Sequence, residues 1–517
     1  MPTYLSPGVY VEEVEGGSRP IEGVGTAVAA FVGLAAQGPY HTPTLVTNWS
    51  QFTQTFGEFV EGSYLAHSVY GYFLNGGGAC YVVRIGGNGT TDGKGAGTKK
   101  ELTEGSQAML GGFRVTALDA GTSSGQQISV EVADPAGDAP PEGSFKLVVK
   151  RGNKVEETYD AVTTARGKDN VVTVVTEKSK LIKIEETTTG AALAKPDKGA
   201  VSLQPSAPAA PTPKRLRADD YVGDVAERTG FGGLEAVDEI TMLAVPDLMS
   251  AYQQGAIDGE GVRAVQLAMI AHCELMGNRM AILDPPPGLN PQRIKDWRVD
   301  EAGYDSKYAT LYWPWPKVFD PSTGTNIHVP PGGHMAGIWA RNDETRGVHK
   351  APANEVIRGA IALETQITKA EHDLLNPVGI NCLRAFPGRG LRVWGARTLS
   401  SDPAWRYVNV RRLFNYLEAS ILGGTQWVVF EPNDDALWAQ IRRTIGAFLV
   451  MEWRKGSLFG LTPDEAFYVK CDRETNPAEG IDAGQVVCEV GVAPSKPAEF
   501  VVFRLAQFSG GTSILSE

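Results

Sequence analysis

A few short stretches of the sequence hold residue types that could take part in chemistry. Cys80 follows three glycines at the entrance to an apolar run, where a thiol can act as a nucleophile if a neighbouring base lowers its pKa. No histidine lies near it in sequence, so we expect Cys80 to be a buried structural residue. His328 and His334 flank a Val-Pro-Pro-Gly-Gly stretch, and none of the histidines shows the spacing of paired metal ligands. The sequence therefore predicts neither a catalytic thiol nor a metal centre.

Phosphate-binding and acid–base patterns are also weak. The glycine-rich stretch GNGTTDGKG resembles a phosphate loop, but Asn88 stands where the first glycine of such a loop belongs and Gly95 where its Ser or Thr belongs. We therefore interpret it as a flexible loop. Asp247 and Asp284 stand at strand ends, where turns and helix caps account for them without a catalytic role. By elimination, the sequence predicts a protein of assembly rather than an enzyme, with no cofactor.

Composition limits the classes of partner. The 517 residues suggest about three domains, and 42% hydrophobic with 21% charged residues is typical of a folded chain. A net charge of −12 argues against direct nucleic-acid binding. Five widely spaced cysteines without a C-x-x-C pattern favour a reducing site of synthesis and no disulfide framework. With no secretory signal and no long apolar run, we expect an intracellular site of synthesis and no membrane insertion.

The elements that would position these residues suggest a multidomain α+β protein. Its α/β core has a parallel or mixed sheet, because short apolar strands alternate with helical patterns. The predicted strands are 24–36, 80–85, 239–248, 279–286 and 308–319. A helix is predicted at 259–278, between the third and fourth of these strands.

An inserted domain interrupts the core. Four strand-like runs between residues 105 and 190 alternate in hydrophobicity and predict a small antiparallel β domain: FRVTALDA, QQISVEVAD, SFKLVVKR and NVVTVVTEKSKLIKIEE. Pro205, Pro208 and Pro211 recur every third residue after it, which favours an extended linker.

The C-terminal part combines helices with apolar chain ends. Helices are predicted at 409–424 and 436–453, the second with one apolar face. The first residues, MPTYLSPGVYVEEV, and the segment 500–508 both look like strands. They could pair with each other within one chain, or each could add to a sheet edge of another copy.

Several ordered motifs resemble the contractile tail sheath family of phages and phage-tail-derived injection machines. They are the opening YLSPGVYVEEV, the segment FLNGGGACYVVRI, the block 329–355 and the stretches NPVGINCLRAFPGRGLRVWGARTLS and YVNVRRLFNYLEASI. The motif residues are Arg84, Pro330, Pro331, Gly337, Arg341, Asp343, Pro352, Trp394, Gly395, Arg397, Arg411 and Arg412.

The resemblance implies a domain plan. It comprises an N-terminal β arm (1–20), a core α/β domain (21–90 with 218–375), an outward-facing insertion (91–217), a tube-facing and mesh-forming domain (376–498) and a C-terminal β arm (499–517). The arms would leave their own subunit and complete β-sheets of neighbours. The arm residues expected to do so are Tyr4, Pro7, Gly8, Val9, Tyr10, Val11, Val501, Phe503, Leu505 and Phe508.

The resemblance also implies partners, a mechanism and a location, which is assembly in the bacterial cytoplasm as part of a phage tail or a phage-tail-like particle. The expected partners are other copies in a six-start helical homopolymer of hexameric rings, an inner tube protein, and baseplate and terminal cap proteins. Contraction from a metastable extended state would drive the tube through a target envelope. Arg442, Arg443, Arg454 and Lys455 are candidate tube contacts, although a solvated basic helix end explains them equally well. The alternatives are a tube or baseplate component of the same particle, a monomeric adhesin-like protein and a monomeric α/β enzyme.

Overall fold

A computed structural model describes most of the chain and divides it into two compact units. The described residues are 20–86, 107–110, 113–117, 128–135, 143–151, 154–165, 167–179, 181–186, 195–196, 198–202 and 216–504. The first unit comprises residues 1–87 and 212–517, and the second comprises residues 88–211. The expected arm residues Tyr4, Pro7, Gly8, Val9, Tyr10, Val11, Leu505 and Phe508 lie outside the described residues, as do the three linker prolines.

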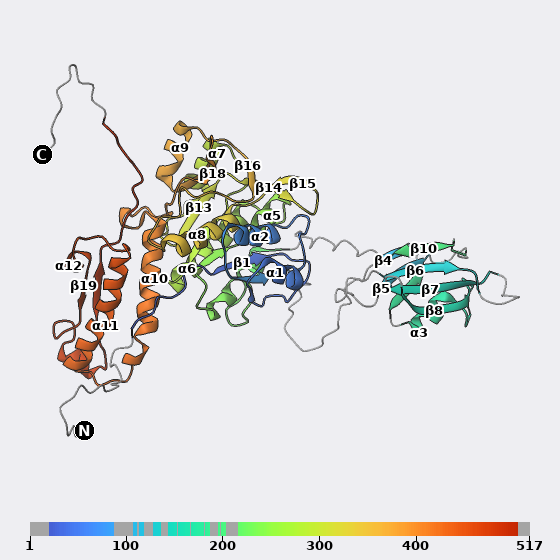
Figure 1. The fold of residues 1–517 in the computed structure, drawn as a ribbon, viewed down its shortest axis with the longest axis horizontal. Coiled ribbons are helices and arrows are strands. Elements are labelled where there is room, and N and C mark those ends of the chain that lie inside the picture. Colours follow the sequence, from blue (N-terminus) through green and yellow to red (C-terminus); the bar gives the residue numbers. More distant parts are fainter. Residues whose placement is uncertain are drawn as a thin grey trace, which may run out of the picture. The chain divides into compact units, whose positions relative to one another are not determined.

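The first unit is built on a mixed sheet of eight strands (Figure 1). In spatial order these are β18 (Gly390–Val393), β17 (Ile380–Phe386), β13 (Ala309–Trp313), β12 (Met280–Leu283), β11 (Met242–Ala244), β1 (Ala29–Gly33), β3 (Cys80–Arg84) and β2 (Thr44–Val46). All neighbours are parallel except the two edge pairs, β17–β18 and β2–β3. Of the two alternatives that the sequence left open, a parallel or a mixed sheet, the mixed sheet is the one observed. Every residue of β1 and β13 is buried, as strands covered on both faces require.

Helices cover both faces of this sheet. One apolar core lies under α4 (Ala218–Val222), α5 (Asp247–Gln253), α6 (Gly259–Met276), α7 (Pro291–Asp296) and α9 (Lys369–Leu375). The other lies under α1 (Trp49–Phe56), α2 (Leu65–Asn75) and α8 (Gly332–Arg346). The predicted helix 259–278 is confirmed as α6, which Asp258 caps by accepting the Gly261 N–H at 2.8 Å. Cys80 is buried on β3 as expected, and burial raises the pKa of its thiol.

Most of the predicted core strands are too long, since 24–36 is a strand only at β1 and 279–286 only at β12, and prolines explain two further differences. The stretch 308–319 forms β13 and then β14 (Pro316–Asp320), which belongs to a separate sheet with β15 (Thr325–His328) and β16 (Ala360–Leu363). Pro314 and Pro316 lack an N–H group and so cannot continue the ladder of a central strand. The stretch predicted at 239–248 is a strand only at β11, because helix α5 begins at Asp247 after Pro246.

The second unit packs two antiparallel sheets around its own apolar core. One sheet has the order β10 (Gly199–Ser202), β6 (Ile128–Ala133), β7 (Phe145–Arg151) and β8 (Lys154–Val162). The other has β4 (Gln107–Leu110), β5 (Phe113–Ala117) and β9 (Ile182–Glu186). The strand predicted across 170–186 is wrong in its first half, which is helix α3 (Val171–Lys178). The Asn170 side chain caps this helix by accepting the N–H groups of Val172 and Thr173, and Val171 and Val175 face the core.

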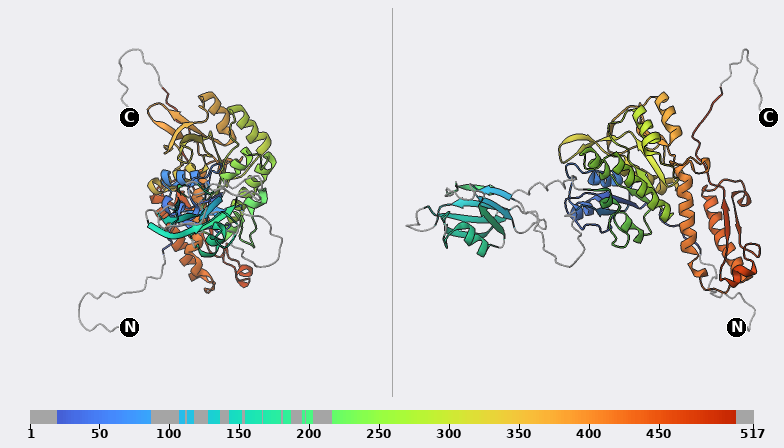
Figure 2. Two further views of the ribbon diagram at one scale, coloured as in Figure 1. Left: turned by 90° about the vertical axis from the view of Figure 1, so that its right-hand side faces the viewer. Right: turned by 180° about the vertical axis from the view of Figure 1, so that it is seen from behind.

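The C-terminal part of the first unit is a helical hairpin beside a small sheet (Figure 2). The two predicted helices are confirmed as α10 (Val408–Gly424) and α11 (Asp435–Arg454), followed by short α12 (Pro463–Ala466) and α13 (Ala478–Asp482). The predicted apolar face of α11 is buried against α10 and the antiparallel pair β19 (Phe467–Lys470) and β20 (Glu489–Val492). Among the described residues, no helix is both long enough and apolar enough to cross a bilayer.

Asp284 gives the core a pH-dependent stability that can be measured. It follows β12 and accepts the N–H of Gly332, the first residue of α8, at 2.8 Å. Burial raises the pKa of Asp284 to about 7, against about 3.9 in an unfolded chain. The folded chain therefore holds this proton more tightly, and the contribution is present below about pH 4 and is lost as the pH rises through 7.

As the pH rises from 4 to 8, we expect the Asp284→Asn variant to lose less stability than the natural chain. The difference between the two should reach about 2–4 kcal/mol between pH 4 and pH 8, with the natural chain falling more steeply. Urea unfolding at several pH values would measure it. Parallel curves for the two proteins would show that Asp284 is not the group responsible.

Candidate assembly interface

The N-terminal end of the described chain is fixed to the C-terminal helices. Ile21 is 3% exposed and packs in the same apolar core as α10 and α11. A methyl group added at Gly424, the last residue of α10, would lie 2.6 Å from the Ile21 side chain, so glycine is needed for this contact. The Val24 N–H donates to Ser420 Oγ at 3.1 Å. Ile21 and Val24 are therefore fixed to the C-terminal helical hairpin.

The C-terminal end of the described chain is fixed by Glu499. Its carboxylate accepts two hydrogen bonds from Arg397, at 2.8 Å from Nε and 2.7 Å from Nη2. Asn376 Nδ2 and the Tyr407 hydroxyl donate to the same carboxylate at 2.8 and 2.9 Å. Burial alone would raise the pKa of Glu499, but these donors outweigh it and lower the pKa below its ordinary value. Glu499 is therefore held as a carboxylate on the core, as a charged anchor for the segment that follows.

The residues that follow this anchor are exposed and apolar. Phe500, Val501, Val502 and Phe503 are 67–85% exposed and pair with no strand among the described residues. The sequence predicts a strand buried on both faces here, and within one chain this segment is neither a strand nor buried. Four consecutive exposed apolar side chains are unusual on a soluble surface and typically mark a site of interaction.

A two-stranded sheet with open edges lies on the same hairpin. Within the described residues, β19 and β20 form a regular ladder only with each other. Tyr468 on β19 and Val490 on β20 are 60% and 37% exposed. Two-stranded sheets are marginal by themselves, and their free N–H and C=O groups can accept a further strand. The chain thus combines an exposed apolar segment with a sheet that can be extended.

The joint between the α/β core and the hairpin is a buried ion pair. Arg412 on α10 donates to Asp343 on α8 through both terminal nitrogens, and the side chains are 3% and 5% exposed. Thr26 completes the joint, because its hydroxyl donates to Asp343 at 2.6 Å and its carbonyl accepts from Arg412 at 3.0 Å. The guanidinium also lies 4.7 Å from the centre of the Trp339 ring. Core, hairpin and N-terminal segment therefore meet at one charged contact.

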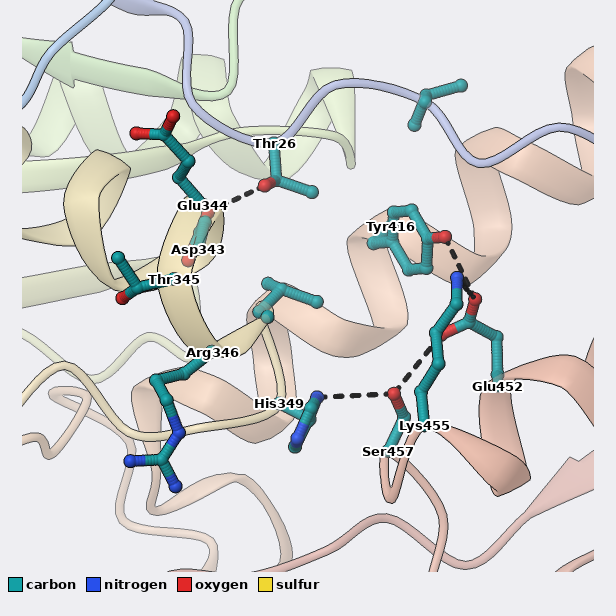
Figure 3. Close-up of a pocket in the computed structure, with 13 residues that line it drawn as sticks. Thr26, Asp343, Glu344, Thr345, Arg346, His349, Tyr416, Glu452, Lys455 and Ser457 are labelled. Atoms are coloured by element: carbon teal, nitrogen blue, oxygen red, sulfur yellow. Dashed lines mark hydrogen bonds and ion pairs between the residues drawn. The ribbon is translucent and has the colours of Figure 1, made fainter.

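A cavity of about 460 Å³ opens beside this joint (Figure 3). Glu452 on α11 is buried and accepts hydrogen bonds from Tyr416, Ser457 and Lys455. The Ser457 Oγ also lies 3.3 Å from Nδ1 of His349, and burial lowers the pKa of that imidazole. In a serine nucleophile relay the histidine stands between the serine and the carboxylate, whereas here the serine stands between the other two. The arrangement therefore ties elements together and does not activate a nucleophile.

The remaining motif residues also organise the fold from within. Arg84 donates to the carbonyls of Gly38 and Ala36, and Arg341 donates to those of Asn75 and Val356. A methyl group at Gly337 would meet the Tyr72 carbonyl oxygen at 2.4 Å, so glycine allows α2 and α8 to pack closely. The other placements are Pro330 and Pro331 before α8, buried Pro352, Trp394 against Phe386, Gly395 against Asn381, and Arg411 over Trp405.

The four candidate tube contacts fall into two groups. Arg442 donates to the Cys471 carbonyl and Lys455 pairs with Glu452 at 2.7 Å, so both are engaged within the chain. Arg443 and Arg454 are exposed, and their spacing places them on one face of α11. Sequence reasoning did not find Glu499 as an anchor, because it lies 102 residues from Arg397 and no local pattern joins them.

Comparison with known proteins identifies relatives along the chain. The family model described as the phage tail sheath protein central domain matches residues 228–399, and the model of the phage tail sheath C-terminal domain matches residues 400–508. Together they span more than half of the chain.

Curated relatives and solved structures agree with these matches. The tail sheath protein of Burkholderia phage BcepMu is 23% identical over 96% of this chain and 95% of its own length. That of Vibrio phage KVP40 is 27% identical over 51% of this chain and 40% of its own length, so the match spans less than half of that relative. The helical sheath of the anti-feeding prophage in its contracted state shares the fold, with 24% identity, a TM-score of 0.58 and coverage of 98% of this chain and all of that chain.

Proposed function

The chain belongs to the phage tail sheath family, whose members are structural proteins and not enzymes, and on that premise we propose that it polymerises as a six-start helical sheath around an inner tube. It is a component of a phage tail or a phage-tail-like particle. The observation that carries the proposal is the exposed apolar segment Phe500–Phe503 immediately after the Glu499 anchor. A segment that is fixed at its root and uncovered within its own chain is suited to add to a neighbour.

The geometry suggests how copies connect. The segments 1–19 and 500–517 add as strands to the open edges of β19–β20 in neighbouring subunits, where main-chain hydrogen bonds provide affinity and alternate side chains provide register. Each arm starts from a fixed root, Ile21 or Glu499, so it can remain joined to its neighbour while the rigid parts of the subunits move.

Contraction is then a change of lattice and not a chemical reaction. Subunits assemble in an extended state of higher free energy and relax to a shorter, wider lattice, which drives the tube outward. Arg443 and Arg454 on α11 grip the tube through charge contacts, because they are exposed on one face of that helix. Baseplate and terminal cap proteins would start and end the polymer.

Electron microscopy of the full-length chain tests this proposal. We expect hollow tubes with a helical surface lattice, alone or on addition of the inner tube protein. Deleting residues 1–19 should abolish the tubes and leave a folded subunit, because the buried anchor Ile21 remains. A second variant keeps the length and changes Val9 and Val11 to Asn, which has low β propensity, and should fail in the same way. Discrete particles from all samples, with an unstable deletion variant, would show that the arm pairs within its own chain.

A further inference from the structure

Two cysteines oppose each other at the end of the β19–β20 sheet. In this antiparallel pair Lys470 stands opposite Glu489, so the next position of the same register brings Cys471 opposite Cys488. Each thiol is also among the groups that shift the pKa of the other, as expected of neighbouring side chains. Cys471 is buried, and Cys488 is half-buried and packs in the same apolar core. The three other cysteines are buried on β3, α6 and β17 of the large sheet and its helices.

The hydrogen-bond pattern places this pair at the position where side chains approach most closely. The Ala493 N–H donates to the Ala466 carbonyl at 2.8 Å, which marks Ala466 and Ala493 as a hydrogen-bonded pair. Such pairs alternate with non-hydrogen-bonded pairs, and counting along β19 puts Cys471 and Cys488 at a non-hydrogen-bonded one. The Cys471 carbonyl accordingly turns away from Cys488 and accepts from Arg442. Cβ atoms at non-hydrogen-bonded positions lie closer together than those at hydrogen-bonded ones, so a small inward shift of the two strand ends would bring them within the range of a disulfide.

We propose that Cys471 and Cys488 form an intrachain disulfide once the particle meets an oxidising environment. The oxidant is a low-molecular-weight disulfide. The Cys488 thiolate, which is the more exposed, attacks one sulfur of the reagent and releases the other half as a thiolate. The Cys471 sulfur then attacks the mixed disulfide and releases the second half. Two protein thiols become one S–S bond, and two electrons and two protons pass to the reagent, which leaves as two thiols.

The bond would close the loop 472–487 at one end of the sheet that receives the arms. That loop is held by Asn476, whose side chain donates to the Val487 carbonyl at 3.0 Å and accepts the Val487 N–H at 2.6 Å. A covalent cross-link limits local opening of β19–β20 by restricting the unfolded loop. The bond itself does not depend on the proposed function, but this consequence for the lattice does. A sheath assembled inside a cell would thus be strengthened after release.

Thiol counting on the full-length protein tests the proposal. The reduced protein is incubated with oxidised glutathione under native conditions. It is then unfolded, its free thiols are alkylated, and its mass is measured by mass spectrometry. We expect three of the five cysteines to remain free and to be alkylated. Peptide mapping should find Cys471 linked to Cys488. Burial raises the pKa of Cys488 to about 12, so its reactive thiolate increases about tenfold from pH 7 to pH 8. The rate of disulfide formation should rise by the same factor.

Two variants separate this bond from general oxidation. In Cys488→Ser, all four remaining cysteines should stay as free thiols. Cys382→Ser removes a buried cysteine of β17 and should still form the bond. Five alkylated cysteines after prolonged oxidation, a persistent glutathione adduct on Cys488 or a bond between other cysteines would overturn the proposal. None of these readouts requires assembly, so they are independent of the sheath function.

Discussion

Replacing Arg412 by alanine lowers the free energy of unfolding of the first unit by about 3–5 kcal/mol. The substitution leaves the Asp343 carboxylate buried without its guanidinium partner, and Thr26 also loses a donor to its carbonyl. It further removes the contact with the Trp339 ring. Because the pair joins α8 to α10, the loss should appear as separation of the helical hairpin from the core. Chemical denaturation followed by tryptophan fluorescence measures the effect.

A matched arginine provides the control for this prediction. Arg443→Ala removes an exposed guanidinium from α11 and should change stability by no more than about 0.5 kcal/mol. A double variant, Arg412→Met with Asp343→Leu, should recover part of the loss, because removing both charges leaves no uncompensated ion. If Arg412→Ala is as stable as Arg443→Ala, the buried pair does not hold the joint together.

Changing Glu499 to Gln should raise the protein concentration needed for assembly by about 10- to 100-fold. The amide keeps the size of the side chain but loses the charge that accepts two hydrogen bonds from Arg397. Hydrogen bonds to charged groups contribute about 1.5–3 kcal/mol, and each 1.4 kcal/mol corresponds to a tenfold change in association. The C-terminal arm is then held less firmly where it leaves the core, so ordering it on a neighbour costs more conformational entropy.

Sedimentation at a series of concentrations measures this threshold. Glu431→Gln, an exposed acid between α10 and α11, serves as the control and should assemble as the natural chain does. The Glu499→Gln subunit should still be folded at the temperature of assembly, although its melting temperature falls with the weakened hydrogen bonds to Arg397, and this separates a defect of assembly from a failure to fold. Equal thresholds for the two variants would show that the Glu499 anchor has no part in assembly.

The parts of the fold that follow from local patterns could be predicted, and those set by long-range contacts could not. The apolar face of α11 and the apolar run of β1 specify their own elements, because periodicity and burial agree. The valine-rich stretch after Asn170 has the composition of a strand, but its cap and its packing against the core of the second unit make it a helix. Likewise, the prolines near residue 314 divide one apolar run between two sheets.

By itself, the sequence determined the family, the α/β character of the core, the two C-terminal helices and the apolar character of both chain ends, since each depends on residues close together in the chain. Only the tertiary structure decided where the arms are fixed. Glu499 meets Arg397, Ile21 meets α10, and Arg412 meets Asp343 and Thr26 across separations that no local pattern encodes. The physical reason is that a buried charge or a close backbone approach is satisfied by whichever partner the folded chain brings near, and that partner is set by the packing of whole elements.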